Sequence, residues 1–184
     1  MTQFKVTLQK AKDHVLKEYD RIGPNDIRWY SPEFWFRHFK IDSKPEETFK
    51  TNAGKIRFYP EVASTIEKLS HKYPLIISSG IPTKYIEIAI QRFTHYFSGL
   101  FSPISDIQTT KKNEIFYIHV CRSLSIKPSS LVHIGDDYEY DYVSPRKIGA
   151  KSIFLDRNGE KPGKHVIRDL TELDEPLGAK LSLL

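Results

Sequence analysis

The chain has 184 residues, enough for one domain with a substantial core and a small appendage. Hydrophobic residues make up 39% and charged residues 28%, which is typical of a globular protein and excludes a disordered one. Lys and Arg number 28 against 23 Asp and Glu, a net charge of +5, without an arginine-rich tract or a nucleic-acid-binding motif. We therefore expect a solvated basic surface and no nucleic-acid partner.

The placement of apolar and cysteine residues excludes further classes of protein. No apolar run approaches the roughly 20 residues of a membrane-spanning helix, and the first residues are too polar for a signal peptide. Cys121 is the only cysteine, which excludes an internal disulfide and a cysteine-based zinc site. We expect a cytoplasmic protein without a membrane partner.

The N-terminal part predicts a small helical region. Apolar residues recur at three- and four-residue steps over residues 4–22, the stripe of an amphipathic helix. Residues 27–41 are rich in aromatic side chains, and Ser31 before Pro32 predicts a helix N-cap with proline at the first helical position. Such an aromatic cluster either packs a helical subdomain or roofs a substrate pocket. Residues 45–55 predict a polar connector.

From residue 59 onward, short apolar runs alternate with helical patterns. The apolar runs predict buried strands at residues 75–79, 100–104, 131–134 and 151–155. Helices are predicted at residues 60–71, 82–93, 113–124 and 144–150, and a terminal turn begins at Thr171. This alternation predicts an α/β fold with a parallel, Rossmann-like sheet and helices on both of its faces.

Residues with reactive side chains follow three of these strands at the carboxyl ends, where such sheets bind ligands. They are Ser78, Ser79 and Gly80 after the first strand, Lys111 and Lys112 at the start of the next predicted helix, and Asp136, Asp137 and Asp141 after the third strand. Because parallel strands end at one edge of the sheet, we expect these groups to converge. Carboxylates suit Mg²⁺ beside phosphate oxygens, while hydroxyl and ammonium groups hold the other phosphate oxygens.

Each of these groups also has a purely structural interpretation. Serines after a strand are commonly caps, lysine pairs are commonly solvated, and acidic residues here can cap a helix. The three aspartates within residues 136–141 are harder to explain in this way, because their carboxylates repel one another unless a cation compensates them. The acidic cluster is therefore the strongest indication of a metal and phosphate site.

Several segments, in the right order, resemble motifs of the haloacid dehalogenase (HAD) superfamily. Leu75–Gly80 resembles the second motif, and Lys112–Phe116 resembles the third, which contains a lysine. The fourth motif and the strand after it are resembled by three segments, Val132–Asp141, Ser144–Ala150 and Ile153–Gly159. The fourth motif is the most specific signal, and the resemblance covers residues 59–173. It implies a HAD-like fold, and it implies a phosphatase-type hydrolase that acts with Mg²⁺ on a small phosphorylated metabolite.

The resemblance also implies roles for the phosphate-binding residues. Ser78 would bind the transferred phosphoryl group, with Ser79 and Gly80 beside it. Lys112 would neutralise that group and the nucleophile. Lys111 stays an alternative, because the proline-containing version of the lysine motif is absent.

The acidic residues would form the metal site. By resemblance, Asp136 binds Mg²⁺ directly, and Asp137 or Asp141 completes or orients the site. The dehalogenase branch of the superfamily lacks this acidic motif. The sequence therefore favours phosphate chemistry over carbon–halogen cleavage.

The first motif of the superfamily has no counterpart in this chain. That motif is a strand ending in Asp-x-Asp, whose first aspartate is the nucleophile and whose second is the general acid/base of the phosphatases. Here Phe4–Leu8 is followed by Gln9, Lys10 and Ala11, without a carboxylate until Asp13. Either the segment with the motif is missing from this chain, which we favour, or the chain is a non-catalytic binding or regulatory relative. The sequence upstream of Met1 would separate the two, and both predict little turnover.

The resemblance divides the chain into a core helix at residues 1–22, a small helical cap at residues 23–57 and the α/β core at residues 58–184. The missing strand would lie between the predicted strands 75–79 and 131–134. Its absence would leave two facing strand edges with unpaired backbone groups, which are costly when buried. We expect residues around Gln3–Leu8 to fill this place as a surrogate strand, or a segment of a second chain, as in a homodimer.

Overall fold

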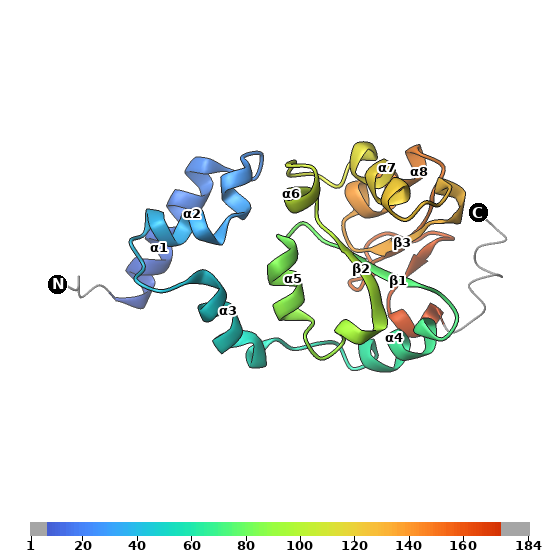
Figure 1. Cartoon of the computed structure of the whole chain (residues 1–184), viewed down its shortest axis with the longest axis horizontal. Coiled ribbons are helices and arrows are strands. Elements are labelled where there is room, and N and C mark those ends of the chain that lie inside the picture. Colours follow the sequence, from blue (N-terminus) through green and yellow to red (C-terminus); the bar gives the residue numbers. More distant parts are fainter. Residues whose placement is uncertain (1–6, 174–184) are drawn as a thin grey trace.

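The computed structural model describes residues 7–173, which form a helical region beside an α/β body (Figure 1). The helical region contains α1 (Leu8–Ile22), η1 (Ile27–Tyr30), α2 (Pro32–His38), α3 (Pro45–Asn52) and η2 (Ala53–Lys55). Within residues 7–173, no helix is long and apolar enough to cross a membrane.

An aromatic cluster packs the helical region. Tyr19 of α1 stacks on Trp35 of α2 with ring centroids 4.0 Å apart, and it meets Trp29 of η1 edge-on at 5.4 Å. The Trp35 indole N–H donates to the Trp29 carbonyl at 2.9 Å, and Trp35 is only 4% exposed. Ser31 caps α2, as its sequence context predicts. These contacts join α1 to the helices of residues 23–57, while the division of the chain at residue 22 stays a prediction.

The expectation of a polar connector over residues 45–55 is wrong, because α3 and η2 occupy this segment. Pro45 stands in the first turn of α3, two acidic side chains follow it, and Lys50 lies in the last turn. These are residues that a helix favours at its two ends. Phe49 of α3 packs on Tyr85 of the α/β body with ring centroids 4.4 Å apart. The sequence of α3 is mostly polar and therefore did not indicate a helix, although Phe49 packs this helix against the α/β body.

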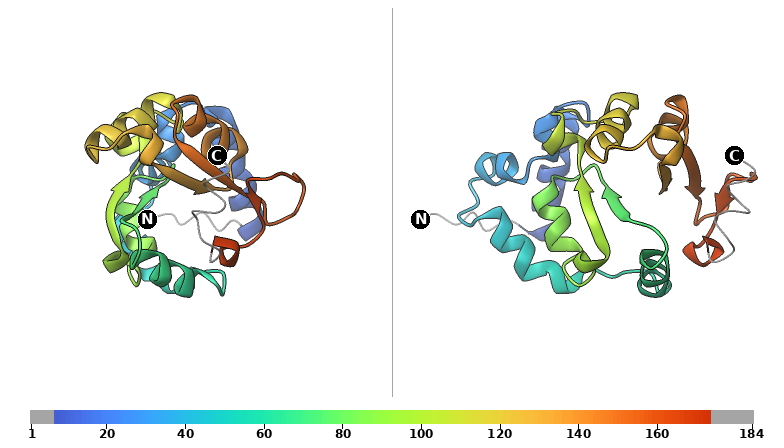
Figure 2. Two further views of the ribbon diagram at one scale, coloured as in Figure 1. Left: turned by 90° about the vertical axis from the view of Figure 1, so that its right-hand side faces the viewer. Right: turned by 45° about the vertical axis from the view of Figure 1, so that its right-hand side comes forward.

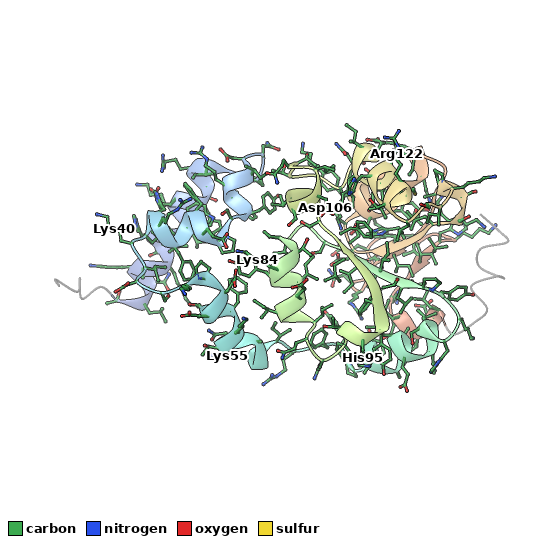
Figure 3. All side chains as sticks on the ribbon, viewed as in Figure 1. Lys40, Lys55, Lys84, His95, Asp106 and Arg122 are labelled. Atoms are coloured by element: carbon green, nitrogen blue, oxygen red, sulfur yellow. The ribbon has the colours of Figure 1, made fainter. Side chains whose placement is uncertain are left out.

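Charged groups also join the helical region to the body. Lys84 of α5 (Thr83–Ala89) extends toward the helical region (Figure 3), where its ammonium lies 2.6 Å from the Glu33 carboxylate and 3.0 Å from that of Glu46. The Tyr85 phenol donates a short hydrogen bond to Glu33. Burial opposes the ionisation of Glu33, but the hydrogen bonds from Lys84 and Tyr85 prevail and lower its pKa.

The α/β body has two parallel sheets within the described residues. Its strands are β1 (Leu75–Ser78), β2 (Phe97–Phe101), β3 (Val132–Gly135), β4 (Lys151–Leu155) and β5 (Val166–Ile167). Its other helices and turns are α4 (Val62–Ser70), η3 (Thr94–Tyr96), α6 (Pro103–Asp106), α7 (Glu114–Ser123), η4 (Pro128–Ser130), η5 (Tyr138–Val143), α8 (Ser144–Lys147) and η6 (Leu170–Leu173). β1 pairs with β2, and β4 lies between β3 and β5. The predicted α/β class and the parallel strands are confirmed.

Several element bounds differ from the prediction. The second strand covers Phe97–Phe101 rather than residues 100–104, because Ser102 caps α6 and Pro103 begins it. The helix predicted at residues 82–93 ends at Ala89. The two-residue strand β5 and the π-helix η5 were not predicted.

Helices cover the two faces of the body. On one face, α7 buries Phe116 and Val120 against Ile76 of β1, Phe101 of β2 and Leu131 beside β3, so one helix contacts both sheets. On the other face, residues of α4 and η6 pack on the three-stranded sheet. This second cluster contains Leu69, Val132, Ile134, Ile153, Leu155, Ile167, Leu170 and Leu173.

β1 and β3 are not paired with each other, and the ribbons of the two sheets lie apart (Figure 2). Residues of both strands line a cavity of about 630 Å³. We call this cavity the interstrand slot; its lining includes Leu69, Tyr73, Leu75–Ser78, Leu124, Ile126 and Leu131–Ile134. It explains why β1 is only half-buried, although its sequence predicts a buried strand. The surrogate strand is not found where the chain is described, because Thr7 caps α1 and Leu8 begins it, 73% exposed. Gln3–Val6 lie outside the described residues.

Candidate functional site

The three aspartates after β3 have different surroundings. Asp136 is exposed where the chain leaves the strand. Asp137 caps η5 by accepting a hydrogen bond from the Tyr140 backbone N–H at 2.8 Å. Asp141 lies inside η5 and is 2% exposed. The three aspartates therefore differ in exposure and hydrogen bonding, and so in whether they can contact a ligand.

Asp141 is the centre of a buried polar network. Its Oδ1 forms an ion pair with the Lys112 ammonium and lies 2.8 Å from His133 Nε2. The Tyr117 phenol lies 3.4 Å from the same oxygen, and the Asp137 backbone N–H donates to Oδ2 at 3.1 Å. Both oxygens of Asp141 are thus already hydrogen-bonded.

This network fixes the ionisation of its members. Burial raises the pKa of Asp141, but the hydrogen bond from His133 and the charges of Lys112 and His133 outweigh burial and lower the pKa below its usual range. Burial and the negative charge of Asp141 raise the pKa of Tyr117. Tyr117 is therefore a neutral donor, and its phenol donates to the Tyr140 carbonyl at 2.7 Å.

Gly135 at the end of β3 leaves space for the Asp141 carboxylate. A Cβ atom at this position would collide with the carboxylate and with the Cβ of Asp141. A glycine is therefore required here by the close approach of η5 to β3 rather than by its backbone angles. This steric requirement explains why a glycine precedes the two aspartates Asp136 and Asp137.

The structure separates the two candidate lysines. Lys112 is 16% exposed and contacts Asp141, whereas Lys111 is exposed to solvent. Both precede α7, whose first residue is Glu114 and whose N-cap is Asn113, so the expectation that the lysines open the helix is wrong. Lys112 is the lysine that belongs to the buried network.

Ser78 ends β1 next to this network. Its hydroxyl is buried and forms no hydrogen bond within ordinary limits among the described residues, although it lies near enough to the Tyr117 phenol to oppose the rise in that group's pKa. Ser79 donates its backbone N–H to the Phe101 carbonyl at 3.0 Å, and the space beside Gly80 is open. Ser78 also lines the same cavity as His133, a member of the Asp141 network.

The donor atoms decide how Mg²⁺ could be held. Both oxygens of Asp141 accept hydrogen bonds, and Asp137 uses its Oδ1 as a cap. Asp136 is therefore the one aspartate of the three that, among the described residues, is neither a cap nor part of the buried network. In the described part of the chain, no three His, Cys, Asp or Glu side chains gather as a metal site. Mg²⁺ commonly uses one or two carboxylates with phosphate oxygens and water. Asp136 fits that arrangement, whereas Asp141 suits the orienting role.

The helical region approaches this edge of the body. Burial and the nearby Tyr140 of η5 raise the pKa of Tyr30, which belongs to η1. An open groove of about 580 Å³ is lined by Ile22, Asn25, Asp26, Ile27, Gln108, Thr109 and Thr110, and the last of these directly precedes the lysine pair. The groove thus lies between the helical region and the segment that leads to Lys111 and Lys112.

Two members of the network, His133 and Tyr117, were not predicted. His133 stands between Val132 and Ile134 in an apolar strand, and this isolated polar residue is a sequence signal that points to a buried partner. Tyr117 lies in α7 within an apolar pattern that predicts ordinary core packing. Its role depends on the approach of η5, which no local pattern reveals.

No protein-family model matches the chain. A haloacid dehalogenase-like hydrolase domain-containing protein of Arabidopsis thaliana is 26% identical over 135 residues, which span 72% of this chain and 53% of that protein. Haloacid dehalogenase-like hydrolase domain-containing protein 3 of Danio rerio is 30% identical over 74 residues, 37% of this chain and 31% of that protein. The chain thus spans about half, or less, of the length of these relatives.

Solved structures share the fold over most of the chain. A HAD phosphatase from Thermococcus onnurineus has a TM-score of 0.80 and 24% identity, covering 94% of this chain and 82% of that one. A predicted phosphoglycolate phosphatase from Haemophilus somnus has a TM-score of 0.64 and 20% identity, covering 91% and 74%. A 2-haloacid dehalogenase from Pseudomonas syringae has a TM-score of 0.63 and 17% identity, covering 96% and 83%. At these identities the likeness shows a common fold.

Proposed function

We propose that the chain belongs to the haloacid dehalogenase-like superfamily and is a phosphatase-type scaffold that binds a small phosphorylated metabolite together with Mg²⁺. The observation that carries this proposal is the buried pair of Lys112 and Asp141; His133, which also contacts Asp141, lines the same cavity as Ser78. A lysine that a buried carboxylate holds in place is a fixed cation for a phosphate group.

Each residue has a role that its surroundings support. Among the described residues, the buried Ser78 hydroxyl has no hydrogen bond and is free to bind a phosphoryl oxygen, and the space beside Gly80 is open. Lys112 neutralises the bound group, and Asp141 orients Lys112. The exposed Asp136 holds Mg²⁺. When bound, the metal neutralises charge on the phosphate.

Hydrolysis through a phosphoaspartate needs a free carboxylate that faces the phosphoryl group. Both oxygens of Asp141 accept hydrogen bonds, so Asp141 does not meet this requirement, and Asp137 is held at the start of η5 through its Oδ1. The sequence likewise offers no Asp-x-Asp at the end of an N-terminal strand. We infer that this chain binds the metal and phosphate but does not itself turn a substrate over.

The metal proposal is tested by titration calorimetry with Mg²⁺ in the presence of inorganic phosphate. The wild type should bind weakly, Asp136→Asn should lose the heat, and Asp42→Asn, a change at an exposed aspartate of the helical region, should retain it. Equal heats from the wild type and Asp136→Asn would remove Asp136 from the ligands.

The inference on turnover is tested with p-nitrophenyl phosphate and Mg²⁺. The purified chain should show no hydrolysis above that of the buffer. Hydrolysis that persists through purification and disappears in Asp136→Asn would reveal a nucleophile elsewhere in the chain and overturn the inference.

A further inference from the structure

The open groove between the helical region and residues 108–110 has the properties of a binding site for an uncharged group with several hydroxyls. We propose that this groove, which we call the polar groove, holds the alcohol part of the phosphate ester, and that this alcohol is a neutral polyol or sugar. The inference names the substrate class of the phosphate site and therefore rests on the proposed function. In Figure 1, the turn after α1 and the segment after α6 form the two walls of the groove.

The polar groove presents neutral hydrogen-bonding groups. Its lining includes the amides of Asn25 and Gln108 and the hydroxyls of Thr109 and Thr110. Within residues 7–173, none of these four side chains forms a hydrogen bond with another residue. An amide offers both donors and an acceptor, and a hydroxyl acts as either, which suits the hydroxyls of a polyol. The groove thus offers unused donors and acceptors from two separate segments.

The charges of the polar groove disfavour an ionised alcohol part. Asp26 is the one charged residue in the described lining, and Arg28 forms an ion pair with it at 2.6 Å. The Asp26 carboxylate also caps η1 by accepting from the Arg28 backbone N–H at 2.9 Å. A ligand carboxylate would find no cation in this lining, and a ligand amine would find its carboxylate already paired. Because an unpaired charge is costly to desolvate, the lining favours a neutral group.

The polar groove also has apolar surface and sufficient size. Ile22 and Ile27 belong to its lining, and they provide surface on which the C–H groups of a polyol chain or sugar ring pack. The volume of about 580 Å³ lies within the roughly 300–1,000 Å³ of small-molecule sites. A few polar groups on a partly apolar wall are the composition of such sites.

The position of the polar groove connects it to the phosphate site. One residue separates Thr110 from Lys112, so their backbones are at most about 7 Å apart. Lys112 is the cation that, in the proposed function, neutralises the phosphate. An ester of several carbons therefore extends from a phosphate group at Lys112 into the groove, whereas the phosphate anion alone does not.

The test is titration calorimetry of the full chain with Mg²⁺ and four ligands: inorganic phosphate, D-sorbitol 6-phosphate, n-hexyl phosphate and 6-phosphogluconate. Hexyl phosphate keeps the six carbons without the hydroxyls, and 6-phosphogluconate has a carboxylate at the end opposite the phosphate. The sorbitol ester should bind at least about tenfold more tightly than each of the others. A tenfold change is about 1.4 kcal/mol, less than two hydrogen bonds contribute.

The four titrations distinguish a failure of this inference from a failure of the proposed function. No heat from any of the four ligands would overturn both. Equal affinities for inorganic phosphate and the sorbitol ester would leave the phosphate site in place and overturn the role of the polar groove. Tightest binding of hexyl phosphate would show merely apolar contact, and tightest binding of 6-phosphogluconate would assign the ester to an acid; either result would overturn the inference.

A glycine substitution links the polyol to the polar groove. Gln108 follows α6 with a φ of 53°, a conformation that glycine adopts freely, so Gln108→Gly removes the amide without straining the backbone. The variant should bind the sorbitol ester about fivefold more weakly and inorganic phosphate unchanged. Ser125→Gly is the matched control, because Ser125 follows α7 with a φ of 54° and lies outside the groove. It should change neither affinity, and an unchanged affinity of Gln108→Gly for the sorbitol ester would place the polyol elsewhere and overturn the inference.

Discussion

The two polar centres at the carboxyl edge of the body differ in how completely their groups are partnered. Around Asp141, four donors from β3, α7 and the loops beside them occupy both carboxylate oxygens. At the end of β1, the buried Ser78 hydroxyl has no hydrogen bond to any residue within 7–173, and the strand itself borders the interstrand slot. The first centre is complete within the chain, and the second is arranged to receive something from outside it.

This difference predicts opposite responses to substitution. Removing a group from the Asp141 network leaves a charge buried without its partner, which is expensive. Removing the Ser78 hydroxyl breaks no hydrogen bond between described residues, so the folded chain should lose little stability. The comparison can therefore be tested by stability measurements alone, independently of any substrate.

The largest effect is expected for Lys112→Met. The methionine fills much of the same space but leaves the Asp141 carboxylate, 2% exposed, without its strongest cation. Breaking a buried ion pair from one side costs about 3–5 kcal/mol. Urea denaturation of the variant measures the loss, and Lys111→Met, at an exposed position, should stay within about 0.5 kcal/mol of the wild type. Equal losses in the two variants would contradict the assignment of Lys112 to the network.

Acid should weaken the same network by a smaller amount. The pKa of Asp141 is lowered in the folded chain, so its contribution to stability is present above its unfolded pKa of about 3.9 and is lost as the pH falls through the folded value. Protonation neutralises the carboxylate, whereas Lys112→Met leaves it charged without the lysine, and therefore acid costs less. The free energy of unfolding should decline below about pH 4 in the wild type, and this decline should flatten in Asp141→Asn. Parallel curves for the two proteins would contradict it.

The sequence predicted elements better than it predicted roles. Apolar runs identified β1, β3 and β4 because a buried strand needs apolar side chains on both faces. α3 escaped prediction because its exposed polar side chains hide the contact of Phe49 with Tyr85. Contacts between distant segments, which local patterns do not encode, decide such cases.

The same limit applies to the candidate site. The sequence placed Asp136, Asp137 and Asp141 in one short segment but could not assign their tasks. The π-helix η5 turns Asp141 inward to Lys112 and leaves Asp136 exposed. The sequence likewise could not predict that Lys112 rather than Lys111 contacts Asp141, because this depends on where the loop before α7 meets η5.

Gly135→Ala should have the next smaller effect. The added methyl group would overlap the Asp141 carboxylate, so η5 must move away from β3. Overpacking of this kind costs about 1–3 kcal/mol. Gly54→Ala is the matched control, because an added Cβ at Gly54 meets nothing within 4 Å. Thermal unfolding of both variants is the measurement, and a Gly135→Ala protein as stable as the control would show that Asp141 does not pack against this position.

The smallest effect is expected for Ser78→Ala, and its sign separates the two centres. The Ser78 hydroxyl is buried without a hydrogen bond, so it bears a desolvation cost that alanine removes. The variant should unfold within about 0.5 kcal/mol of the wild type or be slightly more stable. Ser152 of β4 is the matched control, since it is 0% exposed and its hydroxyl accepts from Arg146 Nε at 2.8 Å and donates to the Tyr142 carbonyl at 2.7 Å.

Ser152→Ala leaves those partners unsatisfied and should cost about 1–3 kcal/mol. A loss of that size in Ser78→Ala would mean that Ser78 already has a partner in the folded chain. Ser78 would then be a structural residue rather than a hydroxyl free to bind phosphate. The contrast between a fully partnered Asp141 network and an unpartnered Ser78 would be wrong.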